Sequence, residues 1–191
     1  MAVAYEDETP ARVAVYAPIR LRPKPLLQAA GAGLVARILL PVLGVATGMD
    51  GVDYYGEVHN AALNRWVHTL LMPVAAYGAL LWMGDLLAPP FTPRRGYVQV
   101  GAYFFYLAHY VTISVKVAAA VALVYAVPLA LAVSSPHGFL RGLTFFVAAL
   151  LMQEIGGHWL SGDPPSRPDA AFNAALYAPY FSVAHVLDGL E

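Results

Sequence analysis

The chain contains no cysteine, and only 12% of its 191 residues are Asp, Glu, Lys or Arg. The first absence excludes disulfide bonds, thiolate metal sites and cysteine nucleophiles. The second is informative because a soluble domain is typically about one quarter charged. With 59% hydrophobic residues, a globule of this size cannot hide its apolar surface from water. The composition therefore excludes an ordinary soluble enzyme and a disordered tail, and it indicates an integral membrane protein.

The few charges nearly cancel, with 11 Lys and Arg against 12 Asp and Glu and a net charge of −1. No excess of positive charge is present that would attract nucleic acid, so no nucleic-acid partner is expected. Residues 1–25 begin acidic and become basic, and they lack the apolar run of a signal peptide. We expect one integral membrane domain over residues 1–191, with residues 1–25 as a flexible N-terminal tail.

Long apolar runs predict the membrane spans, because a bilayer core needs about 20 apolar residues per helix. Val67–Ala88 and Phe139–Leu160 each have this length. The stretch Tyr97–Val133 is long enough for two helices, which we expect to turn near residues 114–116. A last apolar helix, Ala170–Leu190, either crosses the membrane or lies within its surface.

The stretch Ala29–Gly48 is apolar but contains Arg37, Pro41 and several glycines, which favours an interfacial or re-entrant helix over a full span. The expected fold is all-α, a polytopic membrane helical bundle with four to five transmembrane helices plus this N-terminal interfacial helix. With four spans, the start of the first and the end of the fourth share one membrane side. Positive charge concentrates there and marks that side as cytoplasmic. Its basic residues are Arg12, Arg20, Arg22, Lys24, Arg37, Arg65, Lys116 and Arg167.

A polar cluster stands where the first span begins, and it includes His59, Asn64, Arg65 and His68. On one straight helix the two histidines would project about 180° apart, since they are nine residues apart at about 100° each. A metal ion shared by both therefore requires a break between them. We expect Asn64 to act as the N-cap of the helix that holds His68.

A second cluster, Gln153 to His158, lies at the end of the fourth span. Glu154 and His158 are four residues apart and share a helix face, and two glycines between them let another helix or a substrate approach the backbone. A carboxylate this close to hydrocarbon marks a functional site by default. Span parity places both clusters on one membrane face, and imidazole is a common ligand for iron and zinc. A further candidate, His185, lies in the last helix.

Plainer interpretations of the same residues stay open. Glu154 could pair with Arg65 or Arg167, and a lone histidine near a membrane interface is usually a snorkelling or hydrogen-bonded side chain. The bundle could bind lipid or sterol without catalysis, or it could be a small transporter or proton relay that uses Glu154 and His109. The paired histidine boxes of di-iron hydroxylases and desaturases are absent from the sequence.

Three motifs resemble those of a small multi-pass membrane family long catalogued as a domain of unknown function. They are Tyr55-x3-His59-x4-Asn64-x3-His68-x4-Pro73, then Glu154-x2-Gly157-His158, then Ala178-Pro179-Tyr180-Phe181. The family includes endoplasmic-reticulum enzymes described as Fe(II)-dependent 2-hydroxy-fatty-acid dioxygenases, which act in α-oxidation during phytosphingosine breakdown. The likeness covers about Asp53–Leu187 in the family's order and spacing.

The resemblance implies an Fe(II) centre at the cytoplasmic face of the endoplasmic reticulum membrane. Its substrates would be dioxygen and a long-chain 2-hydroxy fatty acid, which loses one carbon as carbon dioxide. The metal ligands would be His59, His68 and His158, with His185 or Glu154 as a further ligand. The residues that support catalysis by orienting these ligands would be Asn64, Glu154 and Asp163. The substrate carboxylate would be attracted by Arg65 or Arg167.

The chain departs from the family's pattern at three positions. The family usually has Gln where this chain has Glu154, although Gln153 is adjacent. It has Glu where this chain has Gly162, next to Asp163, and a Glu is common where this chain has His185. These differences either preserve the number of ligands with altered side chains or indicate a different substrate or metal.

Overall fold

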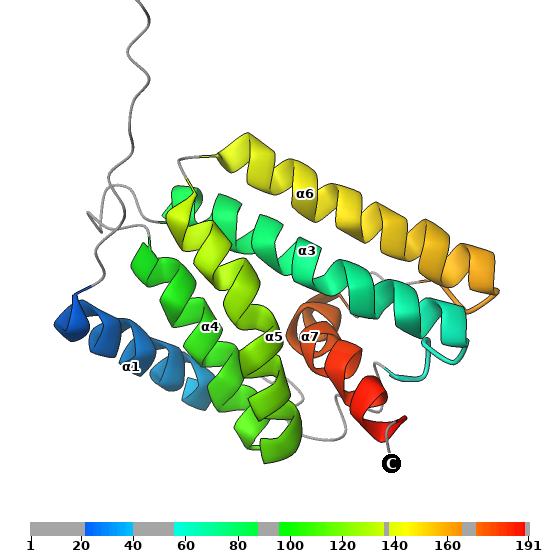
Figure 1. Cartoon of the computed structure of the whole chain (residues 1–191), viewed down its shortest axis with the longest axis horizontal. Coiled ribbons are helices and arrows are strands. Elements are labelled where there is room, and N and C mark those ends of the chain that lie inside the picture. The colour runs from blue at the N-terminus through cyan, green and yellow to red at the C-terminus, as the bar shows by residue number, and fades with distance from the viewer. Residues whose placement is uncertain (1–21, 40–55, 88–95, 136–137, 166–170, 190–191) are drawn as a thin grey trace, which may run out of the picture.

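The computed structural model describes residues 22–39, 56–87, 96–135, 138–165 and 171–189 (Figure 1). Within these ranges the chain is helical and has no strand, which confirms the all-α prediction. The elements are α1 (Pro23–Leu39), α3 (Ala62–Leu87), α4 (Gly96–Val111), α5 (Val115–Ser134), α6 (Phe139–Met152), the π-helical segment η2 (Gln153–Trp159) and α7 (Ala171–Asp188).

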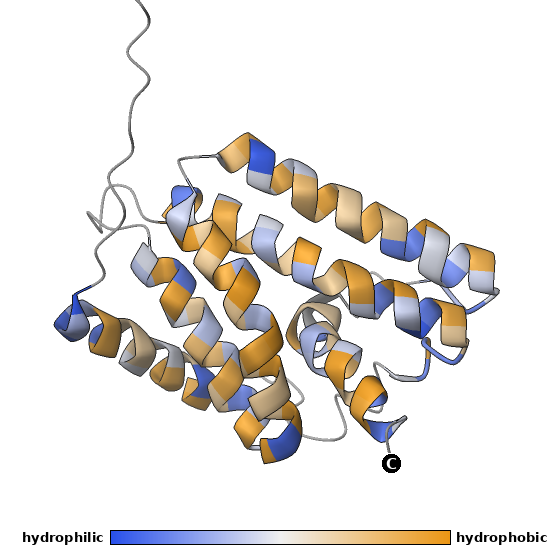
Figure 2. Ribbon diagram, viewed as in Figure 1, coloured by the Kyte–Doolittle hydropathy of each residue, from blue (hydrophilic) through white to orange (hydrophobic). Residues whose placement is uncertain are grey.

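Three of the described helices are long and apolar enough to cross a membrane, namely α3, α5 and the continuous helix Phe139–Trp159 formed by α6 and η2. Figure 2 shows hydrophobic residues along most of their length. Large apolar side chains on their outer faces are open to the surroundings, with Leu70 69%, Leu123 78% and Leu140 74% exposed. Such exposure is costly in water and suits a lipid environment. The total number of spans stays a prediction, because α4 has 16 residues and is short for a crossing.

The predicted turn before residue 115 is confirmed, whereas the N-terminal helix starts at a different residue from the one predicted. The long apolar stretch does turn before residue 115, where the Ser114 hydroxyl accepts a hydrogen bond from the Val117 N–H at 3.3 Å and caps α5. The N-terminal helix starts at Pro23, earlier than predicted and inside the expected tail. Residues 1–21 and 40–48, which carry the rest of those two predictions, lie outside the described residues.

Helices α3 and α6 pack antiparallel at very short range. A Cβ atom added to Gly78 of α3 would lie 2.7 Å from the Gly142 carbonyl oxygen and 2.5 Å from the Phe146 nitrogen of α6. One added to Gly142 would lie 2.6 Å from the Trp82 nitrogen. Small residues permit this backbone contact, which is a common basis of helix association in membranes. The contact also brings the start of α3 beside η2, at the end of α6.

Helix α7 packs against α3 and α5 (Figure 1) and is anchored by tyrosines from α4. Pro179 has no N–H, so the Ala175 carbonyl loses its helical donor. The Tyr106 hydroxyl donates to that carbonyl at 3.0 Å, and the Tyr110 hydroxyl donates to the Leu176 carbonyl at 2.7 Å. These bonds hold α7 in place, and α7 carries Phe181, which packs against His59.

Candidate metal centre

Three histidines from distant parts of the chain meet at one end of the α3–α6 pair. His59 precedes α3, His68 lies in α3, and His158 lies in η2. Their ring centroids are 4.4 Å (59–68), 4.8 Å (59–158) and 5.3 Å (68–158) apart. The prediction that these imidazoles converge is confirmed. We call them the histidine triad.

The histidine triad is buried and has the geometry of a metal site. Its three side chains are 4%, 5% and 1% exposed, and one potential ligand atom from each lies within 4.8 Å of the other two. Metal–nitrogen bonds of about 2.1 Å place two ligand atoms about 3–4 Å apart. Small side-chain rotations would therefore bring the three rings around a single ion, so the residues fit a metal.

An unsatisfied buried atom supports this interpretation. The Nε2 atom of His158 is buried and has no hydrogen-bond partner among the described residues. Buried polar atoms are nearly always paired, because an unpaired one has lost its water without compensation. A bound metal ion would supply the missing partner.

The helix is interrupted between His59 and His68, as a metal ion shared by both would require. The backbone N–H of His59 donates to the Gly56 carbonyl in a turn at 2.9 Å, and α3 begins three residues later at Ala62. The predicted capping role of Asn64 is wrong, because Asn64 lies inside the first turn of α3 and is fully buried. The Asp163 carboxylate instead accepts a hydrogen bond from the Ala61 N–H at 2.9 Å.

Asn64 lies beside His158 and is itself held by Asp163. The Asn64 side-chain N–H₂ donates to the Val58 carbonyl at 3.1 Å and to the Asp163 carboxylate at 2.9 Å. These two acceptors fix the orientation of the amide, since the reversed amide would face them with its own oxygen. The same nitrogen lies 3.3 Å from Nδ1 of His158. Both residues therefore stand where predicted, beside a proposed ligand.

The charge of Asp163 is stabilised by its neighbours. Partial burial alone would raise the pKa of this carboxyl. Hydrogen bonds from Asn64 and from the backbone N–H groups of Ala61 and Asn60, together with the nearby His158 ring, outweigh burial and hold the pKa below its usual value. Asp163 is accordingly a carboxylate at neutral pH.

The segment that carries His158 is a π-helix, whereas the sequence predicted a continuous α-helix. The Leu160 N–H donates to the Ile155 carbonyl five residues earlier, and such wide turns occur mostly as short interruptions of α-helices, often at functional sites. Gln153 and His158 are both buried, while Glu154 is half-exposed. In the sequence Gln153 was noted only as the neighbour of the family's usual Gln position, and no role at the site was predicted for it.

The two glycines of η2 differ sharply. A Cβ atom at Gly157 would lie 2.5 Å from Oδ1 of Asn64 and 3.3 Å from the His68 ring, so only glycine fits between the two elements. A Cβ atom at Gly156 would lie at an ordinary 3.7 Å from Val67. The predicted close approach of another helix is thus confirmed at Gly157.

His185 does not belong to the histidine triad, so the structure does not bring this predicted ligand to the centre. Its ring nitrogens lie 3.3 and 3.4 Å from the Thr69 hydroxyl, and Nδ1 lies 3.3 Å from the Phe181 carbonyl. From the same helix Phe181 packs against His59, with ring centroids 5.3 Å apart. The sequence predicted Phe181 as part of the third family motif and gave it no role beside His59.

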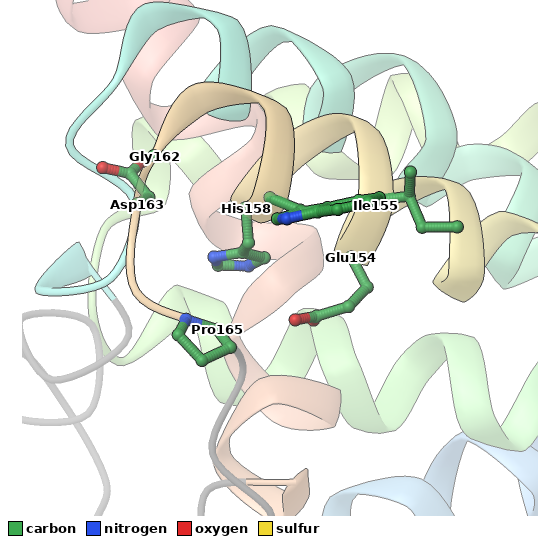
Figure 3. Close-up of a pocket in the computed structure, with 7 residues that line it drawn as sticks. Glu154, Ile155, His158, Gly162, Asp163 and Pro165 are labelled. Atoms are coloured by element: carbon green, nitrogen blue, oxygen red, sulfur yellow. The ribbon is translucent and has the colours of Figure 1, made fainter.

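A pocket of about 360 Å³ lies beside the histidine triad (Figure 3). Its lining residues are Glu154, Ile155, His158, Trp159, Gly162, Asp163 and Pro165. Glu154 is thus placed at the pocket and is not part of the triad. Arg65, in the first turn of α3, is half-buried and does not line this pocket. Arg167 lies outside the described residues.

Comparisons of the chain with protein-family models, with curated proteins and with solved structures found no match. A role for the protein is therefore inferred from the histidine triad, the residues around it and the sequence motifs that contain them.

Proposed function

We propose that the protein is a metal-dependent membrane oxidoreductase, an Fe(II)-dependent dioxygenase of long-chain 2-hydroxy fatty acids. The convergence of three buried imidazoles at one end of the helical bundle carries this proposal. The motifs that resemble the dioxygenase family supply the substrate class, and they include all three histidines.

The donor set favours a transition metal such as iron or zinc over magnesium or calcium. Three neutral imidazoles with no thiolate suit a divalent transition metal, and they leave coordination positions open for substrate and dioxygen. The absence of cysteine from the whole sequence removes thiolate alternatives. Iron is proposed in place of zinc because the resemblance implies an oxidation.

The proposed reaction breaks the C1–C2 bond of the 2-hydroxy acid. One 2-hydroxy acid and one dioxygen give carbon dioxide, water and an acid one carbon shorter, so no further reductant is needed. Fe(II) would supply the reactivity toward dioxygen that the organic substrate lacks. His59, His68 and His158 would bind the ion, and Asn64 with Asp163 would hold His158 in place.

The position of the triad suits a lipid substrate. It lies near the ends of two candidate spans, α3 and the α6–η2 helix, where a polar headgroup and water can meet. Exposed apolar side chains surround that end, with Ile155 49%, Trp159 78% and Leu160 69% exposed. We propose that an alkyl chain lies along this surface. Attraction of the carboxylate by Arg65 or Arg167 and a location at the cytoplasmic face of the endoplasmic reticulum complete the proposal.

The test is to load the detergent-purified protein with Fe(II) without air, add carboxyl-labelled 2-hydroxypalmitate and oxygen, and measure labelled carbon dioxide together with the shortened acid. We expect both products in equal amounts, and neither from His68→Ala or His158→Ala, which should also lose bound metal. Intact lipid binding with no metal in any variant would instead favour the non-catalytic lipid-binding bundle. Bound metal without either product would reject the dioxygenase.

A further inference from the structure

The pocket beside η2 is lined by His158, a member of the histidine triad. His158 is only 1% exposed, yet it lines this pocket, and its Nε2 atom is buried without a partner among the described residues. Figure 3 shows the imidazole between the side chain of Glu154 and the loop that carries Asp163. The pocket therefore offers an approach to an otherwise buried cluster of ligands.

The polar side chains around this approach are of a kind that attracts cations. Glu154 and Asp163 are carboxylates, and none of the described residues that line the pocket is Lys or Arg. A cleft lined by one sign of charge focuses the electric field, concentrates ions of opposite charge and raises their association rate about 10- to 1,000-fold. The same field repels anions such as a fatty-acid carboxylate.

The size of the pocket also fits a hydrated metal ion. Six water molecules occupy about 180 Å³ at about 30 Å³ each, and the pocket measures about 360 Å³. A hexahydrated divalent cation can therefore enter with its water shell. The partly exposed Glu154 carboxylate and the buried His158 imidazole both line the pocket, so they would offer oxygen and then nitrogen ligands as that shell is lost.

We propose that this pocket is the port through which the divalent metal ion reaches the histidine triad, and that Glu154 attracts the ion without being its final ligand. The inference deepens the proposed function, because it depends on the triad being a metal site. It also separates two approaches. The cation enters from water past Glu154 and Asp163, whereas the lipid carboxylate keeps away from these two side chains while the alkyl chain lies along the apolar surface that includes Ile155 and Trp159.

The test measures the rate of metal uptake by the full-length apoprotein in detergent, with Co²⁺ as a coloured probe in a stopped-flow spectrometer. Glu154→Gln removes the charge with little change in shape, and Glu57→Gln is the matched control. Glu57 is exposed, lies two residues before His59, and does not line the pocket. Asp163 is left unchanged, since its hydrogen bonds hold Ala61 and Asn64.

We expect Glu154→Gln to slow Co²⁺ uptake about tenfold at low salt, and Glu154→Lys to slow it about 100-fold. Both effects should shrink as salt is added. The final absorption spectrum should match that of the unaltered protein, because the triad is intact. Glu57→Gln should load at the unaltered rate.

Four outcomes would overturn the port. Unchanged uptake by Glu154→Gln, or equal slowing by Glu57→Gln, would reject it and leave the metal centre standing. An altered final spectrum in Glu154→Gln would make Glu154 a ligand. If the unaltered protein binds no Co²⁺, Zn²⁺ or Fe²⁺ at equilibrium, the proposed metal centre fails and the port fails with it.

Discussion

The two ends of the α3–α6 pair use the same packing device for different purposes. At one end Gly78 and Gly142 bring backbone against backbone, with Leu81 fully buried nearby. At the other end Gly157 brings backbone against the polar side chains of Asn64 and His68. The first contact holds the helices together, whereas the second gathers polar atoms in a buried place. Close helix packing thus joins the helices in one place and positions the proposed ligands in the other.

The largest expected effect is at the packing end. Gly142→Val would force a branched side chain against the Trp82 nitrogen and the Gly78 carbonyl, which are backbone atoms that cannot move independently. We expect a loss of about 3 kcal/mol in the free energy of unfolding, at the upper range for overpacking, and loss of bound metal as well. Thermal unfolding in detergent followed by circular dichroism measures it. A stable variant would contradict the close contact.

The ligand end should behave oppositely. His158→Ala removes a proposed ligand from the histidine triad, so we expect the protein to fold normally and to bind no stoichiometric Fe²⁺ or Zn²⁺. Elemental analysis of purified protein, beside the same thermal unfolding assay, checks both parts. Metal retained at full stoichiometry would show that the triad is not the binding site.

Gly157→Ala tests whether positioning at that end depends on glycine. The added methyl group would displace the Asn64 amide and press on the His68 ring, so we expect metal affinity to fall about 100-fold, as for loss of supporting contacts. Gly156→Ala is the matched control, because its methyl group meets Val67 at an ordinary distance. Competition with a chelator measures both affinities. Equal values for the two variants would refute the distinction.

The smallest effect is expected from Asp163→Asn. The amide oxygen can still accept a hydrogen bond from Ala61, but the negative charge that faces Asn64 and His158 is lost. We expect metal affinity to fall about tenfold, at the low end for a supporting residue, with little change in thermal stability. The same chelator competition measures the change, and an increase in affinity would contradict the supporting role.

The arrangement of the helices could be predicted from the sequence, because it follows from the lengths of the apolar runs and from the number of spans. Apolar runs located the helices, and the parity of antiparallel spans placed His59 and His158 at the same end. The side-chain roles could not be predicted as well, since they depend on contacts across the fold. Asn is a residue type that often caps helices locally, but the side chain of Asn64 bonds to Asp163, which is 99 residues away in the sequence. Nothing in the local sequence distinguishes these possibilities.

The π-helical turn was missed for a related reason. Hydropathy follows the apolar character of Phe139–Leu160, and this character is the same whether the backbone bonds span four or five residues. The turn changes the direction in which the later residues of the segment project, among them the buried Gly157 and His158. His185 was misjudged because a helical residue within reach of α3 can face Thr69 as easily as the triad.

The wide turn of η2 has a consequence for how such a centre could arise or disappear. A π-turn corresponds to one additional residue within an α-helix, and each α-helical residue rotates the chain by about 100°. Closing this turn into a regular α-helix, with every residue retained, would therefore swing His158 about 100° away from its two companions. The difference between a chelating bundle and an inert one would then be the hydrogen-bond register of one helical turn.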